Sequence, residues 1–188
     1  MLNFIFYGIV FCRGNKEAVI VMDDNTPRRV SESAVDNSPY QVFHNDLNAI
    51  ETVFGGRVLE IADRLAGIVA QKHSNLVCVT LLVDSIRFLA PARRGETLVF
   101  KASVNRVWGS SMEIGIKVFA ENLLTNESRH VFSAYFTFVA VNENGRPIPI
   151  RAVIPETEDE KRRYVEAGLR RANRLRLGEE LVRSRQEQ

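Results

Sequence analysis

Cysteine and histidine are scarce in this chain of 188 residues. The two cysteines, Cys12 and Cys78, stand in apolar runs without metal-ligand spacing, which excludes a disulfide framework and indicates a reducing, cytoplasmic compartment. The three histidines, His44, His73 and His130, have no mutual spacing typical of a metal site or a catalytic triad. We therefore expect neither a metal nor a redox cofactor.

The sequence also lacks a serine-nucleophile elbow, because no Gly-x-Ser-x-Gly motif occurs in it. Long hydrophobic runs are missing too. The apolar opening from Met1 to Cys12 is too short for a membrane span, and it has neither a positive n-region nor a small-residue cleavage site. We expect no signal peptide and no membrane insertion. The opening is either an extra strand or an extension upstream of a start at Met22.

Neither sign of charge is in large excess, since the chain has 25 lysines and arginines, 23 acidic residues and a net charge of +2. This balance is too mild to indicate a nucleic acid partner, although scattered arginines can pair with the phosphates of a nucleotide. The length suits one domain, and 45% hydrophobic residues suffice for a packed core. We expect an N-terminal extension and linker over 1–39, a domain over 40–150 and a C-terminal helical extension over 151–188.

A glycine pair, Gly55 and Gly56, opens an apolar run that continues to His73. The run is too long and too evenly apolar for a strand, so it predicts a helix about 27 Å long. The first turn of a helix has unpaired N–H groups and a partial positive charge, and glycine lets those donors approach a ligand closely. A polarised carbonyl oxygen against Gly56 would be stabilised as negative charge develops on it, which indicates an oxyanion site.

One acid, Asp63, stands within this apolar helix, where a carboxylate is costly unless it has a role or a partner. It lies seven residues after Gly56 and so returns to almost the same helix face, but about 10 Å further along the axis. Both groups must touch one small reacting group within about 3 Å. Two packed helices satisfy this better than one, which predicts a dimer whose sites are shared. The alternative is a structural acid held by backbone donors, as we expect for Asp84.

Four strand-like segments follow the helix, over residues 76–89, 97–107, 112–118 and 129–141. The first is apolar on both faces and is expected at the centre of a sheet, whereas the third alternates with a period of two. An apolar helix followed by antiparallel strands must be enclosed by them. We predict an α+β fold with an antiparallel sheet wrapped around one long central helix. An exposed peripheral helix is expected over residues 156–185, with acids at its start and arginines nearer its end.

Several motifs give the chain a specific resemblance to the hotdog-fold acyl-CoA thioesterases, both the bacterial short enzymes and the two-domain brain acyl-CoA hydrolase. The matching residues include Asp46, Asn48, Phe54-Gly55-Gly56, Asp63, Ala66-Gly67-Ile68-Val69-Ala70, Val79-Thr80, Val83-Asp84-Ser85-Ile86, Phe88, Pro91, Gly95, residues 109–114, residues 136–141 and residues 153–163. The resemblance covers about residues 30 to 177. It implies a hotdog fold, hydrolysis of acyl-CoA thioesters to free fatty acid and CoA, and assembly as a dimer or a trimer of dimers.

The same resemblance implies roles for individual residues. Asp63 is implied to act as general base or as a nucleophile that forms a mixed anhydride, the glycine turn to supply the oxyanion donor, and Asn48 to complete the site from the partner subunit. The alternative for Asn48 is a loop asparagine that caps a turn. The family usually has glycine at the position of Glu51, so the local loop geometry or the access channel is expected to differ.

Contacts to the CoA part of the substrate are expected from Gly55, Arg94, Ser110, Ser111 and Arg146. Hydroxyl, N–H and guanidinium groups are suitable partners for phosphates, and simple solvation is the alternative for these surface residues. Two other functions are possible within the fold, a non-catalytic acyl-CoA-binding protein and a dehydratase. Hotdog dehydratases are similar to one another in a site histidine, and no histidine stands in the active stretch of the central helix.

Overall fold

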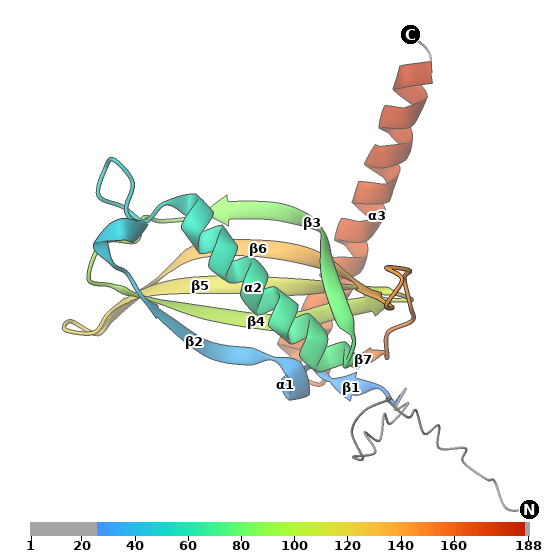
Figure 1. Cartoon of the computed structure of the whole chain (residues 1–188), viewed down its shortest axis with the longest axis horizontal. Coiled ribbons are helices and arrows are strands. Elements are labelled where there is room, and N and C mark those ends of the chain that lie inside the picture. Colours follow the sequence, from blue (N-terminus) through green and yellow to red (C-terminus); the bar gives the residue numbers. More distant parts are fainter. Residues whose placement is uncertain (1–25, 187–188) are drawn as a thin grey trace, which may run out of the picture.

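The computed structural model describes residues 26–186, so the expectations for the apolar opening and for Cys12 and Met22 lie outside the described part. Its elements follow the predicted order (Figure 1). They are β1 (Arg28–Arg29), α1 (Val30–Ser33), β2 (Val35–Gln41), a 3-10 turn (His44–Asp46), α2 (Gly55–Ser74), β3 (Val77–Phe88), β4 (Thr97–Trp108), β5 (Ser111–Asn122), β6 (Glu127–Val141), β7 (Val153–Ile154) and α3 (Glu158–Gln186). The α+β class and the hotdog arrangement are confirmed.

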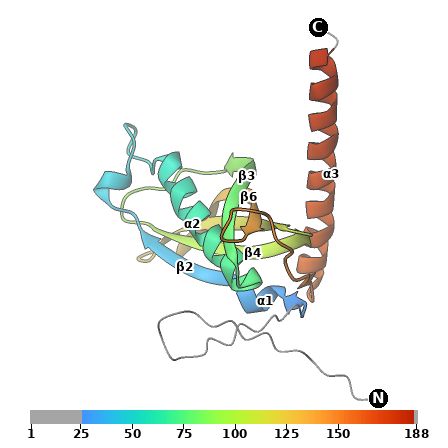
Figure 2. The same ribbon diagram turned by 45° about the vertical axis from the view of Figure 1, so that its right-hand side comes forward.

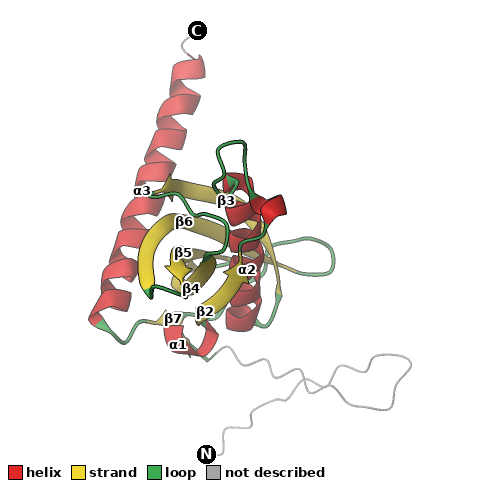
Figure 3. Ribbon diagram, turned by 90° about the vertical axis from the view of Figure 1, so that its left-hand side faces the viewer, coloured by secondary structure: helices red, strands yellow, loops and turns green. Residues whose placement is uncertain are grey.

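The long helix α2 lies along the inner face of a curved sheet (Figures 1 and 3). Small residues make this close packing possible, since Ala62, Ala66 and Ala70 recur every four residues and are fully buried. The helix ends at Asn75, whose left-handed backbone (φ 58°) lets its N–H reach the carbonyl of Gln71 at 2.8 Å. The predicted central helix therefore exists over nearly the predicted range.

The main sheet has five antiparallel strands in the order β2-β4-β5-β6-β3. Strand β3 lies at an edge, not at the centre as its apolar composition predicted. Three of its apolar side chains are 48–66% exposed, namely those of Val77, Val79 and Leu81. The pattern reported the apolar surface of the strand correctly, but it carries no information about which neighbour covers that surface.

Residues 28–39 form regular elements, whereas the sequence predicted a linker there. Val30 and Ser33 of α1 are buried, and β2 pairs with β4 from Val35 onward. Strand β2 is polar because it is an edge strand with only part of one face covered. The sheet thus begins before the expected domain boundary. Strand β1 pairs with β7 in parallel, so Arg28 lies beside Val153 and ties the N-terminal part to the C-terminal part.

The C-terminal helix α3 packs on the outer face of the sheet, on the opposite side from α2 (Figures 2 and 3). The N-terminal half of α3 is held to the sheet by Ala167, which is fully buried, and by Arg170. The Arg170 guanidinium lies 2.7 Å from the buried carboxylate of Glu113 and 3.6 Å from the centre of the Tyr135 ring. A peripheral helix was predicted, and it is confirmed. No helix in the described part is long and apolar enough to cross a membrane.

Candidate active site

The first turn of α2 is built from a glycine pair because two aromatic rings lie against it. A Cβ on Gly55 would come within 2.8 Å of the Phe88 ring, and a Cβ on Gly56 would collide with the ring of Phe54. The helix begins its own hydrogen bonds one residue later, when the Arg57 N–H donates to the Phe54 carbonyl at 2.9 Å. The N–H groups of the two glycines precede that bond, so the predicted pair of donors lies at the positive end of the helix.

Asp63 lies two turns further along α2, partly buried beside the edge strand. The hydroxyl of Thr80, on β3, donates a hydrogen bond to its carboxylate at 2.8 Å. Within residues 26–186, no lysine or arginine forms an ion pair with Asp63. The carboxylate is therefore oriented by one neutral donor and keeps its remaining lone pairs for another proton donor. Sequence reasoning placed Asp63 correctly on the helix but noted Thr80 only as part of the resemblance, without a role.

Asn48 caps a tight turn in the loop before α2. Its side-chain oxygen Oδ1 accepts the N–H groups of Ile50 and Thr52 at 3.0 and 3.2 Å, and its side-chain nitrogen Nδ2 donates to the Thr52 hydroxyl at 2.9 Å. These are the contacts of the turn-capping alternative. They do not remove Asn48 from the site, because this residue also lines the cavity described below.

A cavity of about 480 Å³ opens between this loop, the start of α2 and the end of β3. Asn48 and Gly55 lie on its wall, and most of the other wall residues are apolar, among them Val58, Phe88 and Phe132. One chain thus brings Asn48 and Gly55 together, whereas neither Gly56 nor Asp63 is among the residues that line this cavity.

The loop is held to α2 by a buried acid, Asp46, which sequence reasoning noted only as part of the resemblance. Its carboxylate accepts hydrogen bonds from the Tyr40 hydroxyl (2.8 Å), the Phe43 N–H (2.8 Å) and the Arg57 guanidinium (3.1 Å). Burial opposes the charge, but these hydrogen bonds and the positive charge of Arg57 outweigh it and lower the pKa of Asp46. The Asp46 carbonyl also accepts the Phe54 N–H, which fixes where the helix begins.

The residues expected to contact CoA are divided between the two ends of the sheet. Arg94 lies in the β3–β4 loop, next to the cavity, whereas Ser110 and Ser111 lie at the β4–β5 turn and Arg146 lies beyond the end of β6. The twelve residues of β4 separate these ends by about 36 Å. Ser111 is buried, and its hydroxyl donates to the Trp108 carbonyl. A single chain does not assemble this set.

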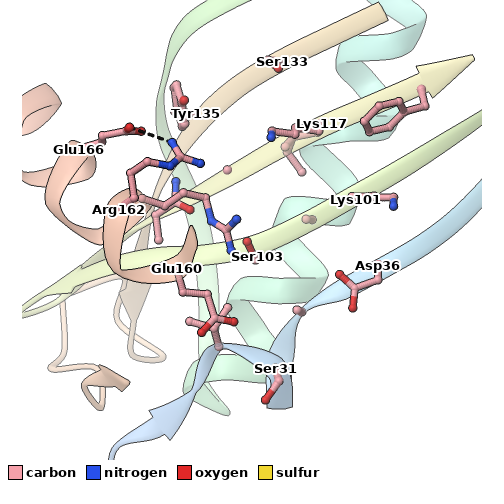
Figure 4. Close-up of a pocket in the computed structure, with 18 residues that line it drawn as sticks. Ser31, Asp36, Lys101, Ser103, Lys117, Ser133, Tyr135, Glu160, Arg162 and Glu166 are labelled. Carbon is pink, nitrogen blue, oxygen red and sulfur yellow. Dashed lines mark hydrogen bonds and ion pairs between the residues drawn. The ribbon is translucent and has the colours of Figure 1, made fainter. Parts of the chain in front are cut away.

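A second cavity of about 480 Å³ lies on the outer face, between the sheet and the start of α3 (Figure 4). Its wall is mixed in charge, with Lys101 opposite Lys117 on neighbouring strands and with Arg162 bonded to Glu166 at 2.8 Å. None of the predicted site residues lines it. This cavity is therefore separate from the candidate active site.

Metal and thiol chemistry find little support in the described residues. No group of three or more histidine, cysteine or acidic side chains is arranged to hold a metal ion within residues 26–186. Cys78 is buried against Ser74, and burial raises the pKa of its thiol, so the thiol stays protonated at neutral pH. His73 is buried at the end of α2, and burial lowers its pKa to about 4.

Comparison with known proteins places these features in a family. The model of the thioesterase superfamily matches residues 51–126. The uncharacterized acyl-CoA thioester hydrolase YkhA of Bacillus subtilis is 38% identical over 64% of this chain and 70% of its own. Protein VdlD of Helicobacter pylori is 40% identical over 73% of this chain and 78% of its own length. The cytosolic acyl coenzyme A thioester hydrolase of Rattus norvegicus is 37% identical over 61% of this chain, which spans only 30% of that protein.

Solved structures agree with the fold. An apo-hexameric acyl-CoA thioesterase superposes with a TM-score of 0.79 at 36% identity, over 81% of this chain and 97% of that one. A variant of an acyl-CoA hydrolase from Staphylococcus aureus superposes with a TM-score of 0.79 at 31% identity, over 87% of this chain and 99% of that one. Three solved variants of the staphylococcal enzyme each have one residue replaced by alanine: an asparagine, an aspartate or a threonine. The aspartate follows the asparagine by 15 residues, and the threonine follows the aspartate by 17 residues. Asn48, Asp63 and Thr80 have the same spacing here.

Proposed function

The chain belongs to the thioesterase superfamily, and we propose that it hydrolyses acyl-CoA thioesters to a free carboxylic acid and CoA. The observation that carries the proposal is the Asp63 carboxylate, which is half-buried, unpaired by any base within residues 26–186 and aimed by Thr80. Its spacing from Asn48 and Thr80 matches three positions replaced in the staphylococcal acyl-CoA hydrolase.

Two routes through Asp63 lead to the same products. As a general base, the carboxylate removes a proton from water, and the resulting hydroxide adds to the thioester carbonyl. As a nucleophile, the carboxylate adds to the carbonyl itself and forms a mixed anhydride, which water then cleaves. In both routes the carbonyl oxygen becomes negatively charged and is stabilised by the Gly56 N–H, the carbon–sulfur bond breaks, and the CoA thiolate takes up a proton.

We propose that the acid and the oxyanion donor of one site come from two chains. Asp63 and Gly56 of one chain are about 10 Å apart along the axis of α2, which is too far for one reacting carbonyl. Asp63 contacts β3 through Thr80, and Gly55 contacts β3 through Phe88. Both groups therefore lie beside the open edge of the sheet. A second copy joined along β3 would bring its own Asp63 toward this cavity, and the three dimers of a hexamer would each hold two such sites.

The apolar cavity near Asn48 has the character required to take an acyl chain, since Val58, Phe88 and Phe132 line it. Arg94 lies in the β3–β4 loop, two residues after Ala92 on the cavity wall, and its guanidinium is proposed to pair with the CoA phosphates. Ser110 and Arg146 contribute to the same CoA only from another chain, because they lie at the far end of β4. The proposal requires no metal or redox cofactor and is that of a cytoplasmic enzyme.

The decisive experiment replaces Asp63 with asparagine and measures initial rates on a chain-length series of acyl-CoAs. Asp63→Asn keeps the shape of the side chain and removes the base or nucleophile, so kcat should fall by about 10² or more. The matched control is Asp36→Asn, an exposed carboxylate on β2 beside the outer cavity (Figure 4), which should retain activity within about twofold. A folded Asp63→Asn protein with wild-type rates would exclude this role for Asp63.

A further inference from the structure

Helix α3 crosses the outer face of the sheet one strand at a time. Successive side chains of the helix contact β4, then β5 and β6, then the edge strand β3. The contacts are Tyr164 with Arg106 (4.3 Å from ring centre to guanidinium carbon), Arg170 with Glu113 (2.7 Å) and Tyr135, and Arg174 with Asp84. The helix therefore leaves its own sheet at Asp84, near the middle of β3.

The helix continues beyond the sheet edge to Gln186 (Figures 1 and 2). These twelve further residues, 175–186, extend about 18 Å, which corresponds to between three and four strand spacings. We call them the overhang. A polar helix of this length is marginal in water without a partner. A covering surface for the overhang is therefore expected.

The face of α3 that contacts the sheet changes character where the sheet ends. Leu177 and Leu181 follow Arg170 and Arg174 by seven residues each, so they continue the sheet-facing side of the helix. They are 55% and 49% exposed in the single chain. Leu175, Gly178 and Val182 flank them and line a hollow formed only by α3 residues. An apolar face thus begins where the chain's own sheet no longer lies beneath the helix.

We infer that the overhang docks on the outer face of a second copy of this chain, joined along the open edge of β3. An antiparallel pair of β3 strands about their midpoint places the two-fold axis next to Asp84, so each overhang passes directly over the other copy. Cys78 contacts Ser74 of α2, and Val77 and Val79 therefore point to the outer face. Both valines are largely exposed, and they offer the apolar surface that Leu177 and Leu181 lack.

Charge favours this occupant. The overhang has an acidic centre between basic flanks, formed by Glu179 and Glu180 between Arg174, Arg176, Arg183 and Arg185. A two-fold axis across the β3 edge makes the two α3 helices antiparallel, so the acids of one helix lie near the arginines of the other. Exposed ion pairs of this kind add little affinity, but they fix the register of the two helices. The inference rests on the β3-edge dimer of the proposed function.

The test places charge on the docking face. Leu177→Asp combined with Leu181→Asp should raise the dissociation constant for self-association at least tenfold in sedimentation experiments. The matched control is Val165→Asp, a residue 59% exposed that lies about 120° and 160° around the same helix from Leu177 and Leu181, and it should change the dissociation constant less than threefold. Circular dichroism checks that both proteins are folded.

A second measurement does not depend on the charged variant folding. In a background with Cys12→Ser and Cys78→Ala, a chain carrying Leu181→Cys is mixed with a chain carrying Val79→Cys and treated with a short bismaleimide. A covalent heterodimer is expected, and Val165→Cys in place of Leu181→Cys should give none, because Val165 lies about 160° around the helix from Leu181. Unchanged self-association together with no cross-link overturns the docking. If the cross-link forms but acyl-CoA is not hydrolysed, the docking stands and the proposed function falls.

Discussion

Glu51 has a backbone conformation that side chains rarely adopt. Its φ of 58° lies in the left-handed region, within the turn that Asn48 caps. The turn needs this conformation whichever residue is present, and glycine adopts it without a steric penalty. This explains in physical terms why the resembling family usually has glycine there. At this departure from the family, the structure shows a left-handed backbone that carries a side chain.

Replacing Glu51 with glycine should therefore stabilise the protein. Relief of left-handed strain gains about 1–2 kcal/mol, and the extra freedom of glycine in the unfolded chain costs about 0.5–1 kcal/mol. The free energy of unfolding in urea should rise by about 0.5–1 kcal/mol. Glu51→Ala serves as the control, because it removes the charge but keeps the Cβ and should give no gain. Equal effects of the two substitutions would show that the backbone is not strained.

Thr80 is expected to act as a positioning residue for Asp63. Hydrogen bonds to charged groups contribute about 1.5–3 kcal/mol, so Thr80→Val should lower kcat by about tenfold to a hundredfold while KM changes little. Thr80→Ser restores the hydroxyl and should recover most of the rate. In an Asp63→Asn background, Thr80→Val should have no further effect. An equally large loss in that background would mean that Thr80 acts independently of Asp63.

The sequence indicated some of these residues because their chemistry conflicts with their surroundings. An acid in an apolar helix and two adjacent glycines at its start are unusual enough to predict a site. Thr80 is not unusual in that way, since a β-branched residue fits any strand. Its role follows only from the packing of β3 against α2, which joins positions 17 residues apart. Ser111 stood out as a loop serine, but its hydroxyl is used within its own chain.

At the scale of elements, the sequence correctly predicted the helices and strands whose apolar residues are buried within a single chain. The fully buried alanines of α2 and the alternating core residues of β5 give a clear period. Strand β2 was missed because a half-covered edge strand has too few apolar residues to show one. Strand β3 was placed at the centre because its apolar residues were counted without knowing what covers them. Edge position depends on long-range pairing, which no local pattern reports.

The C-terminal end of α2 has a buried histidine that should make stability depend on pH. Burial lowers the pKa of His73 to about 4, and the positive charges of Arg28 and Arg151 act in the same direction, against a hydrogen bond to the Arg151 carbonyl and the charge of Glu32. The ordinary value is about 6.5. Between these two pKa values the unfolded chain binds a proton that the folded chain does not. Folding stability is therefore complete above pH 6.5 and decreases as the pH falls toward 4.

We expect the free energy of unfolding to fall by about 2 kcal/mol between pH 7 and pH 5 because of His73. Urea titrations across this range measure the slope. His73→Gln keeps a donor for the Arg151 carbonyl but cannot be protonated, so most of the slope should disappear in that variant. His44→Gln is the control, since His44 is exposed in the 3-10 turn, and its slope should match the wild type. An unchanged slope in His73→Gln would assign the pH dependence to other groups.

At the scale of the whole molecule, the arrangement of one chain leaves the reaction incomplete. The cavity is lined by Asn48 and Gly55, whereas Asp63, on the same helix as Gly55, is not among its lining residues. The edge strand β3, with its exposed apolar residues, lies beside both. A surface of this kind on an edge strand invites pairing with another chain. The exposed edge and the divided site agree with our proposal that a second copy completes each site.

Subunit complementation tests that explanation directly. Asn48→Ala and Asp63→Asn each damage every site of a homodimer. If Asn48 and Asp63 of one site come from different chains, a heterodimer of the two variants has one intact site and one doubly damaged site. After complete subunit exchange at equal concentrations, half of the dimers are mixed, so about one quarter of wild-type activity should return. Exchange is verified by mass spectrometry of differently tagged chains, and mixing each variant with itself is the control. Activity that stays at the level of the separate variants, despite exchange, would place Asn48 and Asp63 of each site within one chain.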